Sequence, residues 1–470
     1  MTLYLELITT SLQDLFGSSF NPSKLFNWSK RFVSNMWFIC CATWFIARTL
    51  CSYLCTRNTQ IFIKELFETL SRKNILYIKV FQSLALNTKF IDENTHEELL
   101  KYSDNVYWDP KSIDWELIYS LETKHGIRFE EGYTPINAGM ISIVFKVTMQ
   151  GHQCPLILKM KRKNIEARLS EAIEEFELIA YFASFVPMFK MLQLDDVIRE
   201  NIQTIKAQTD FQTEIMNINA VRENCANIKY VKIPLVYDEF DEYPDIIVME
   251  YIKGMTISNV LKEDYEEFAK LIIKFTYVNL LIHGLMHADM HSGNILFIKN
   301  ENNLCGDSDL PKYQIGVIDF GIVCTIEEKF KNILYDIFDS IQRVTGKEFI
   351  ETSMHMLYDL EPHMEKIGSY HYDKMIEMPV MIIERIFYEK NSNKQINILF
   401  EMYSILIHIR TYLKEHEVLD QPLVMNEEFV KIQTILAMIQ GVVLKLCGED
   451  CILLMNNTFH ELFDTNLLTN

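Results

Sequence analysis

The sequence predicts a two-lobed α+β protein, and three features of the chain support that prediction. Short segments rich in β-branched and aromatic residues occur between about 129 and 160, and again from 228 to 252. A helical pattern lies between these two groups. From 258 to the end the pattern is helical, apart from two short strands near 295 and 315. This order of elements is typical of an α+β chain.

Composition places the 470-residue chain among ordinary globular proteins. It is 49% hydrophobic and 23% charged, so it contains enough apolar material for a large core. The net charge of −19 argues against a nucleic-acid binder, which needs clustered lysine and arginine. Ten cysteines without a CxxC pair predict reduced thiols in an intracellular protein, with neither disulfides nor a zinc knuckle.

The N-terminal segment, residues 1–58, contains an apolar stretch at 32–55 that follows Lys30 and Arg31. Arg48 interrupts this stretch before it reaches the roughly 20 apolar residues that a bilayer span requires. Two interpretations stay open. The stretch is either an interfacial helix in which Arg48 reaches the lipid headgroups, or a helix buried against the rest of the protein. The first makes the protein membrane-associated.

Residues 59–128 are predicted to form a helical extension, because apolar residues recur at three- and four-residue spacing from 61 to 86. The whole chain has only 15 glycines, and none lies between 18 and 125. Glycine makes up about 7% of the residues in an average globular protein. This scarcity excludes architectures with many tight turns, which need glycine at left-handed positions.

Residues 129–253 are expected to form the smaller lobe. Within it, 141–149 and 154–160 have the pattern of a β-hairpin around the turn QGHQ, and the chain from 165 to about 217 has a helical pattern. Residues 254–470 are expected to form the larger, mostly helical lobe, which holds the catalytic and metal-binding loops.

The chemistry is concentrated in HADMHSGNILF, residues 287–297, and IGVIDFG, residues 315–321. Asp289 and Asn294 lie five residues apart on one loop, and Asp319 follows an apolar strand. Carboxylate and amide oxygens suit Mg²⁺ that bridges substrate phosphates. HxDxxxxN followed by DFG is the catalytic and metal signature of kinases. We therefore expect Asn294 and Asp319 to bind metal and Asp289 to position or deprotonate the acceptor.

A kinase-like site also needs a strand lysine, a helical glutamate that orients it, and a hinge for adenine. The strand LILK supplies Lys159, and the helical segment TDFQTEIMN supplies Glu214. The segment VMEYIKG has the character of a hinge between lobes, with the backbones of Glu250 and Ile252 facing the adenine edge.

The phosphate loop has no GxGxxG. The corresponding segment, PINAGMISIVF, contains one glycine ahead of the LILK strand. Together these motifs resemble the UbiB family of atypical kinase-like proteins, also called AarF-domain or ADCK proteins, over residues 75–330. That resemblance implies a bilobal protein-kinase-like fold and assigns nucleotide contacts to the residues that stand where the family usually has AAAS, which are Asn137, Ala138, Gly139 and Met140.

Other motifs extend the resemblance. HADMHSGN is close to the family's HADPHPGN, and LKMKRKNI resembles the family's strand lysine and the basic segment after it. TDFQTEIMN resembles the ExD helix, with Asp210, Glu214 and Asn217 matching. KVFQ supplies Lys79 and Gln82 where the family has KxGQ, an extension that the resemblance implies folds over the nucleotide cleft.

Two residues depart from the family pattern. Gln208 replaces the glutamate of ExD, and Phe81 replaces the glycine of KxGQ. In the family the KxGQ lysine pairs with that glutamate, so here Lys79 would meet a neutral amide. A neutral amide attracts the lysine ammonium less than a carboxylate does, so we expect a weaker contact and weaker autoinhibition through it.

The chain after DFG predicts the kind of substrate. Thr325 and Glu328 have the spacing of a capping box, which predicts a helix starting four residues after Gly321. This leaves no room for an activation segment or an APE motif. A small-molecule or lipid-linked substrate, or ATP hydrolysis coupled to another process, is favoured over a peptide.

The sequence thus predicts a Mg–ATP-dependent atypical kinase or ATPase, which the resemblance links to membrane lipids or coenzyme Q biosynthesis. Two alternatives stay open: a pseudokinase or scaffold that binds nucleotide, and an ordinary protein kinase, which Ala288 and the short segment after DFG disfavour. Metal binding by His283, His287 and His291 is the minor alternative, since Gly284 and Gly293 indicate a loop there.

Overall fold

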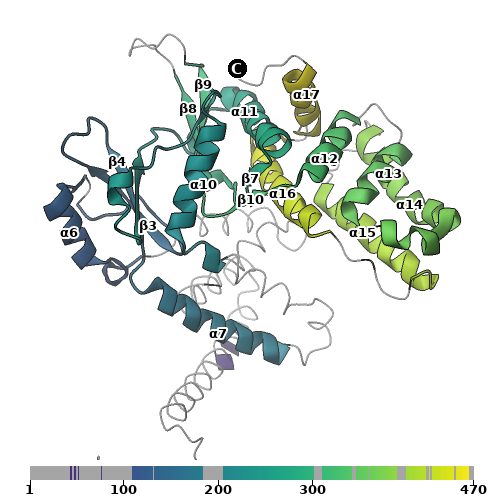
Figure 1. Cartoon of the computed structure of the whole chain (residues 1–470), viewed down its shortest axis with the longest axis horizontal. Helices are drawn as coiled ribbons and strands as arrows, with labels where there is room; N and C mark the ends of the chain where they lie inside the picture. The colour runs from purple at the N-terminus through teal and green to yellow at the C-terminus, as the bar shows by residue number, and fades with distance from the viewer. Residues whose placement is uncertain are drawn as a thin grey trace, which may run out of the picture. The chain divides into compact units, whose positions relative to one another are not determined.

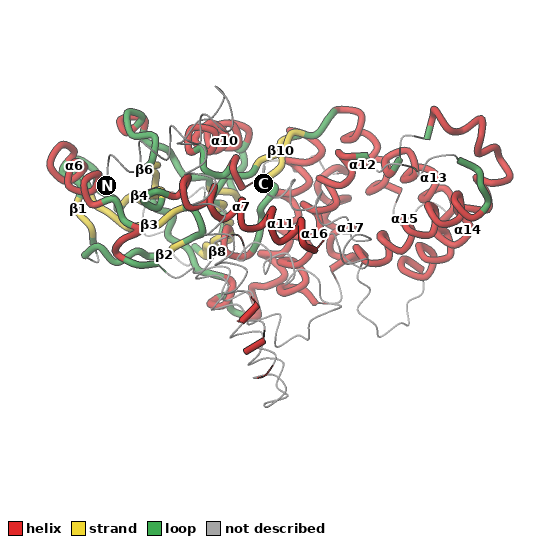
Figure 2. The backbone as a smooth tube through the Cα atoms, turned by 90° about the horizontal axis from the view of Figure 1, so that it is seen from below, coloured by secondary structure: helices red, strands yellow, loops and turns green. Residues whose placement is uncertain are grey.

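The structure is a computed structural model (Figures 1 and 2). It describes residues 43–44, 47–48, 51, 76, 108–130, 132–183, 205–300, 310–340, 346–358, 360–388, 398–419, 423, 426–448 and 451–464. The chain divides into two compact units. The first contains Met1–Ile113, Ala138–Met140 and Arg162–Ile205, and the second contains Asp114–Asn137, Ile141–Lys161 and Lys206–Asn470. The domain boundaries expected from the sequence stay a prediction.

The described part of the first unit is built around the short helix η1 (Pro110–Ser112) and the helix α7 (Ile165–Ala183). Asp109 caps η1 with a capping box that it shares with Ser112. Helix α7 confirms the first part of the helical pattern predicted from 165 to about 217. Its buried residues recur at helical spacing: Ile165, Leu169, Ala172 and Ile173.

The second unit contains an antiparallel sheet with strand order β1-β3-β4-β6. Its strands are β1 (Arg128–Phe129), β3 (Ser142–Thr148), β4 (Leu156–Lys161) and β6 (Ile246–Glu250), while β2 (Asn137–Ala138) lies off this path. The predicted hairpin is confirmed, with Ser142 opposite Lys161. Side chains of β3 alternate between buried and partly exposed positions from Ile143 to Val147, the pattern of a strand with one buried face.

Two smaller sheets hold the loops with chemical motifs. One has the order β5-β9-β8, formed by Val231–Lys232, Tyr313–Val317 and Ile295–Lys299. The other pairs β7 (Leu285–His287) with β10 (Val323–Thr325). The strand expected from 228 is shorter than predicted. Pro234 lacks the backbone N–H that a ladder needs, and the chain then forms the 3₁₀ helix η2 (Asp238–Phe240).

The rest of the second unit is helical, as predicted (Figures 1 and 2). Its longer helices are α6 (Trp115–His125), α10 (Phe211–Asn224), α11 (Tyr265–Tyr277), α12 (Glu328–Ser340), α13 (Gly346–Leu357), α14 (Met364–Tyr388), α15 (Ile398–Glu415), α16 (Glu427–Cys447) and α17 (Cys451–Asp464). Helix α11 packs against α16 and α17. Tyr277 of α11 lies 5.0 Å from the Phe338 ring and 5.5 Å from the Phe459 ring, between centroids.

Short turns of helix complete the unit. They are the π-helix η5 (Val278–His283) and the 3₁₀ helices η3 (Ile257–Asn259), η4 (Lys262–Asp264), η6 (Ser292–Asn294) and η7 (Glu361–His363).

The capping box predicted at Thr325 is wrong. Thr325 is the last residue of β10 and pairs with Leu285. Helix α12 begins at Glu328, and the Glu327 carbonyl accepts from the Lys331 amide at 3.1 Å. Strand pairing therefore takes precedence over the local cap motif, although a helix does begin soon after Gly321.

Only five residues of the apolar 32–55 stretch are described. Thr43, Trp44, Ala47, Arg48 and Cys51 are all exposed, and the Arg48 guanidinium lies 5.9 Å from the centroid of the Trp44 ring. Across the described helices, none is long and apolar enough to cross a membrane.

Candidate active site

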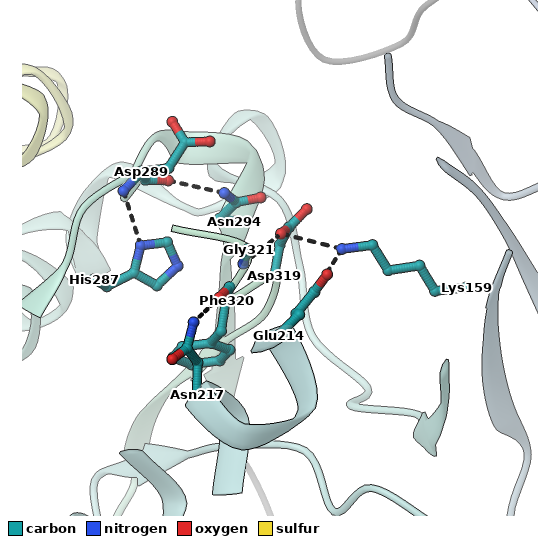
Figure 3. A network of polar contacts seen from close by, with 9 residues as sticks. All are labelled: Lys159, Glu214, Asn217, His287, Asp289, Asn294, Asp319, Phe320 and Gly321. Atoms are coloured by element: carbon teal, nitrogen blue, oxygen red, sulfur yellow. Dashed lines mark hydrogen bonds and ion pairs between the residues drawn. The ribbon is translucent and has the colours of Figure 1, made fainter. Parts of the chain in front are cut away.

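Lys159 lies at the centre of the candidate site. It extends from β4, where Val144 of β3 and Ile247 of β6 flank it in register. The side chain is buried, and its Nζ lies 2.6 Å from Glu214 Oε1 and 3.1 Å from Asp319 Oδ1. Residues from three separate elements thus meet at one cation (Figure 3).

Helix α10 positions Glu214 because its start is fixed. The Asp210 carboxylate accepts from the backbone amides of Gln212 at 3.0 Å and Thr213 at 3.3 Å, as an N-cap does. Glu214 therefore falls in the first turn and is buried. Asp210, which the resemblance places in the ExD motif, is an exposed cap.

Asp319 follows β9 in a backbone conformation that is uncommon for its residue type. Its φ is 65°, in the left-handed region. Its Oδ1 accepts from the Gly321 amide at 3.3 Å, and the side chain is partly exposed. The Ile318 amide donates to the Asn294 carbonyl at 3.0 Å, so the two predicted metal ligands lie on adjoining backbone.

The residues of the predicted catalytic loop are held by hydrogen bonds between side chains and backbone. The Asn294 amide nitrogen donates to the Asp289 carbonyl at 2.8 Å, and the Asp289 amide donates to His287 Nδ1 at 3.1 Å (Figure 3). The Ala288 amide donates to the Ile322 carbonyl at 3.0 Å, which joins this loop to the segment after DFG. Asp289, Asn294 and Asp319 are thereby brought together as expected.

The charges of the central cluster are strongly coupled. Burial opposes the charged form of Lys159, but the carboxylates of Asp319 and Glu214 outweigh it and raise the lysine pKa. Burial raises the pKa of Glu214 to about 6, although Lys159 partly offsets this. Burial also opposes the charged form of Asp319, yet the nearby lysine lowers its pKa to about 2. The cluster is therefore ionised at neutral pH.

The catalytic-loop histidines organise backbone. Burial lowers the pKa of His287, which keeps its ring neutral and able to accept at Nδ1. His291 Nδ1 accepts from the Gly293 amide at 3.1 Å, and Gly284 ends η5 with a φ of 63°. The described residues include no group of three or more His, Cys, Asp or Glu that is arranged to hold a metal.

The hinge residues lie at and just beyond the end of β6. The Glu250 amide donates to the Leu235 carbonyl at 2.8 Å, and its carboxylate lies 2.7 Å from Lys232 Nζ. Ile252 is buried over β9, where a Cβ on Gly316 would lie 2.8 Å from Ile252 Cγ2. Among the described residues, no hydrogen bond engages the Ile252 backbone.

The remaining predicted nucleotide contacts are divided between the two units and the residues outside the described structure. Ala138, Gly139 and Met140 belong to the first unit, where Arg162 Nε donates to the Gly139 carbonyl at 2.9 Å. Asn137 belongs to the second unit. Lys79, Gln82 and Phe81 lie outside the described residues.

The sequence does not predict that two further residues lie beside Lys159, Glu214 and Asp319. Gln208 is partly exposed, and its Cγ lies 3.8 Å from where a Cβ on Gly321 would be. Asn217 Nδ2 donates to the Phe320 carbonyl at 3.0 Å. Asn217 matches the family pattern, but the motif alone gives it no role. Its position three residues after Glu214, on the same helix face, is the available signal.

Comparisons with known proteins agree with the motifs. A family model described as ABC1 atypical kinase-like domain matches residues 111–353. The chain is 28% identical over 277 residues to a protein named Probable protein kinase UbiB from Shewanella sp. (strain W3-18-1), covering 56% of this chain and 48% of that protein. It is 26% identical over 309 residues to a protein of the same name from Shewanella woodyi, covering 63% and 54%. The chain thus spans about half the length of these curated relatives.

Two solved structures are also similar to this chain. The Rv3197–erythromycin complex from Mycobacterium tuberculosis aligns with a TM-score of 0.46 and 17% identity, covering 88% of this chain and 98% of that one. The Rio2 kinase–ADP/Mg²⁺–phosphoaspartate complex from Chaetomium thermophilum aligns with a TM-score of 0.29 and 12% identity, covering 74% and 86%.

Proposed function

The chain belongs to the ABC1 atypical kinase-like family, whose model covers residues 111–353, and from that premise we propose that it is a magnesium-dependent, ATP-using phosphotransferase or ATPase. The observation that supports this most is the buried contact of Lys159 with Glu214 at 2.6 Å and with Asp319 at 3.1 Å. A lysine oriented by a helical carboxylate beside a metal-binding aspartate is the arrangement that kinases use to hold a nucleotide.

Lys159 binds the α- and β-phosphates in this proposal. Its Nζ is held from one side by Glu214, so little side-chain entropy is lost when a phosphate binds. The raised lysine pKa keeps the ammonium charged at any physiological pH. Glu214 orients the lysine and does not itself contact the nucleotide.

Asp319 and Asn294 suit a magnesium ion. Asp319 uses Oδ1 for Lys159 and Gly321, while its Oδ2 has no partner among the described residues. Asn294 donates through Nδ2, and within the described structure no hydrogen bond engages its Oδ1. Both are hard oxygen donors of the kind that Mg²⁺ prefers. When bound, Mg²⁺ neutralises the charge on the phosphates.

Asp289 positions or deprotonates the acceptor. Hydrogen bonds with His287 and Asn294 fix its backbone amide and carbonyl, so the carboxylate is presented from a rigid loop. A general base needs that rigidity, because proton transfer requires hydrogen-bond distance to the acceptor.

The acceptor is proposed to be a small molecule or a lipid-linked compound, with a role in lipid or coenzyme Q metabolism. Only residues 322–327, all described, separate Gly321 from α12, and three of them pair with β7. That segment leaves no peptide-docking activation loop. The name Probable protein kinase UbiB belongs to the relatives and does not identify the acceptor of this chain.

A second candidate function is nucleotide binding without turnover, as in a pseudokinase. Gln208 favours it, since a neutral side chain stands beside Gly321 where the family has a glutamate. The two candidates differ in one respect only, the production of ADP.

The test is a thermal-shift and ATPase measurement with ATP, with and without Mg²⁺. Wild type should gain more stability from ATP when Mg²⁺ is present than when it is absent, and should release ADP with water as the phosphate acceptor. Asp319→Asn should lose both effects, whereas Asp241→Asn, an exposed aspartate, should keep them. Magnesium-dependent binding without ADP release supports the pseudokinase, and absence of binding in wild type contradicts both candidates.

A further inference from the structure

Helix α10 contacts the Asp-Phe-Gly segment at a second point, separate from Glu214. Asn217 lies three residues after Glu214, on the same face of the helix. Its Nδ2 donates to the Phe320 carbonyl at 3.0 Å across 103 residues of sequence (Figure 3). One turn of α10 therefore contacts Lys159 through Glu214 and the residue after Asp319 through Asn217.

The Phe320 peptide directly follows Asp319, so a contact that fixes this peptide also restrains the backbone of Asp319. Asp319 has a φ of 65°, which residues other than glycine keep only where surrounding contacts hold them. The Phe320 side chain is fully buried, and its ring centroid lies 5.0 Å from that of His287. The side chain is thus fixed by packing and the carbonyl by Asn217.

We propose that Asn217 is a positioning residue for magnesium: by holding the Phe320 carbonyl, it keeps Asp319 in the left-handed conformation that presents its carboxylate to the metal. The effect on magnesium binding rests on the proposed function. The hydrogen bond itself is independent of any ligand.

The contact needs an amide nitrogen. A carbonyl accepts only from a donor, and the Asn217 side chain supplies one at the end of a short, partly buried chain. Asn217→Ala removes the donor, and Asn217→Asp replaces it with an acceptor of nearly the same shape. Asn217→Asp therefore keeps the packing and places an acceptor opposite the Phe320 carbonyl.

The helix offers a matched control. Asn219 is exposed, two residues further along α10, and no hydrogen bond joins its side chain to another described residue. Asn219→Ala and Asn219→Asp carry the same change in residue type and helix propensity without touching Phe320.

The first measurement is hydrogen–deuterium exchange of the nucleotide-free full chain. Peptides that contain residues 315–325 should exchange faster in both Asn217 variants and at the wild-type rate in both Asn219 variants. Unchanged exchange in Asn217→Asp, with the protein folded, overturns the proposed contact whatever the chain binds.

The second measurement is a Mg²⁺ titration of ATP binding. The Asn217 variants should need about twofold to tenfold more Mg²⁺ for half-maximal effect, the range expected for loss of one hydrogen bond. ATP binding without Mg²⁺ should stay at the wild-type level. When Asp319→Asn is already present, the Asn217 substitution should not change the Mg²⁺ dependence of ATP binding further, because its effect acts through Asp319.

The outcomes are distinguishable. Faster exchange with unchanged Mg²⁺ dependence overturns the positioning role, and so does a full additive effect in the Asp319→Asn background. If wild type binds ATP with the same affinity with and without Mg²⁺, the proposed function and the positioning role are both overturned. The exchange measurement still decides whether Asn217 holds the Phe320 carbonyl.

Discussion

At the scale of single residues, the site depends on one buried cation between two carboxylates. Lys159 and Glu214 are nearly inaccessible to solvent, so neither charge is stable there without the other. Asp319 is partly exposed, which leaves it available to a ligand. Lys159 therefore stabilises the fold at the site that we propose binds the nucleotide.

Lys159→Met should destabilise the fold by about 3–5 kcal/mol at pH 7, because it leaves two carboxylates facing each other without a cation. Without the lysine the pKa of Glu214 rises above the already raised value of about 6. The folded variant then binds a proton more tightly than the unfolded chain, so its stability increases as pH falls toward the ordinary value of 4.5. Urea unfolding between pH 5 and 8 measures this.

The control is the double variant Lys159→Met/Glu214→Gln, which removes the stranded charge and should recover most of the lost stability. Its pH profile should be flatter than that of Lys159→Met. A single variant whose unfolding free energy keeps a constant offset from wild type across the pH range would contradict the electrostatic account.

The sequence predicts the principal residues of the site, but it does not predict all of their contacts. The order and spacing of motifs identify Lys159, Glu214, Asp289, Asn294 and Asp319, and the structure brings these five together. Their functional roles stay predictions. The contact of Asn217 with Phe320 joins residues 103 positions apart, and no local pattern encodes such a pairing.

At the scale of elements, the pairing of β7 with β10 determines the path of the chain after DFG. Three residues on each side form this small sheet, and it places α12 shortly after the Asp-Phe-Gly segment. Gly284 makes the sheet possible, since it has a φ of 63° and its carbonyl accepts from the Ile326 amide at 2.8 Å.

Gly284→Ala should therefore destabilise the protein by more than the roughly 1–2 kcal/mol that a left-handed alanine costs. An added Cβ would lie 3.1 Å from the Ile326 carbonyl oxygen, which is backbone and cannot easily move. Gly126→Ala is the matched comparison, with a φ of 66° and open space around the added Cβ. Denaturant unfolding of both variants gives the difference. Equal losses would show that the close contact at Gly284 is unimportant.

Element prediction succeeded where periodicity was strong. Alternation and β-branched residues identified the β3–β4 hairpin, and the spacing of Leu169 and Ile173 identified α7. The sequence does not predict strands β7 and β10, because three residues are too few to show alternation and their pairing is long-range. At Thr325 the same pairing replaced the predicted helix cap.

At the scale of the whole molecule, the α+β, kinase-like fold was predictable and the family match confirms it. The motifs that revealed it lie within residues 111–353, except for KVFQ. The order of motifs along the chain was decisive, since each alone is weak. The helical extension at 59–128 lies mostly outside the described residues, and the domain boundaries stay a prediction.

If residues 1–58 associate with membranes, the full chain should co-sediment with neutral phosphatidylcholine vesicles, and a chain without residues 1–58 should not. Neutral vesicles are the appropriate surface, since the net charge of −19 opposes anionic ones. Equal recovery of both chains in the supernatant, or equal sedimentation, would count against this assignment.

The central claim is that Asp319 makes ATP binding depend on magnesium, and isothermal titration calorimetry measures this directly. ATP titrated into wild type should bind more tightly with Mg²⁺ than with EDTA. Asp319→Asn should bind ATP with the same weaker affinity in both conditions. Equal affinity in wild type with and without Mg²⁺, or an undiminished magnesium effect in Asp319→Asn, would contradict it.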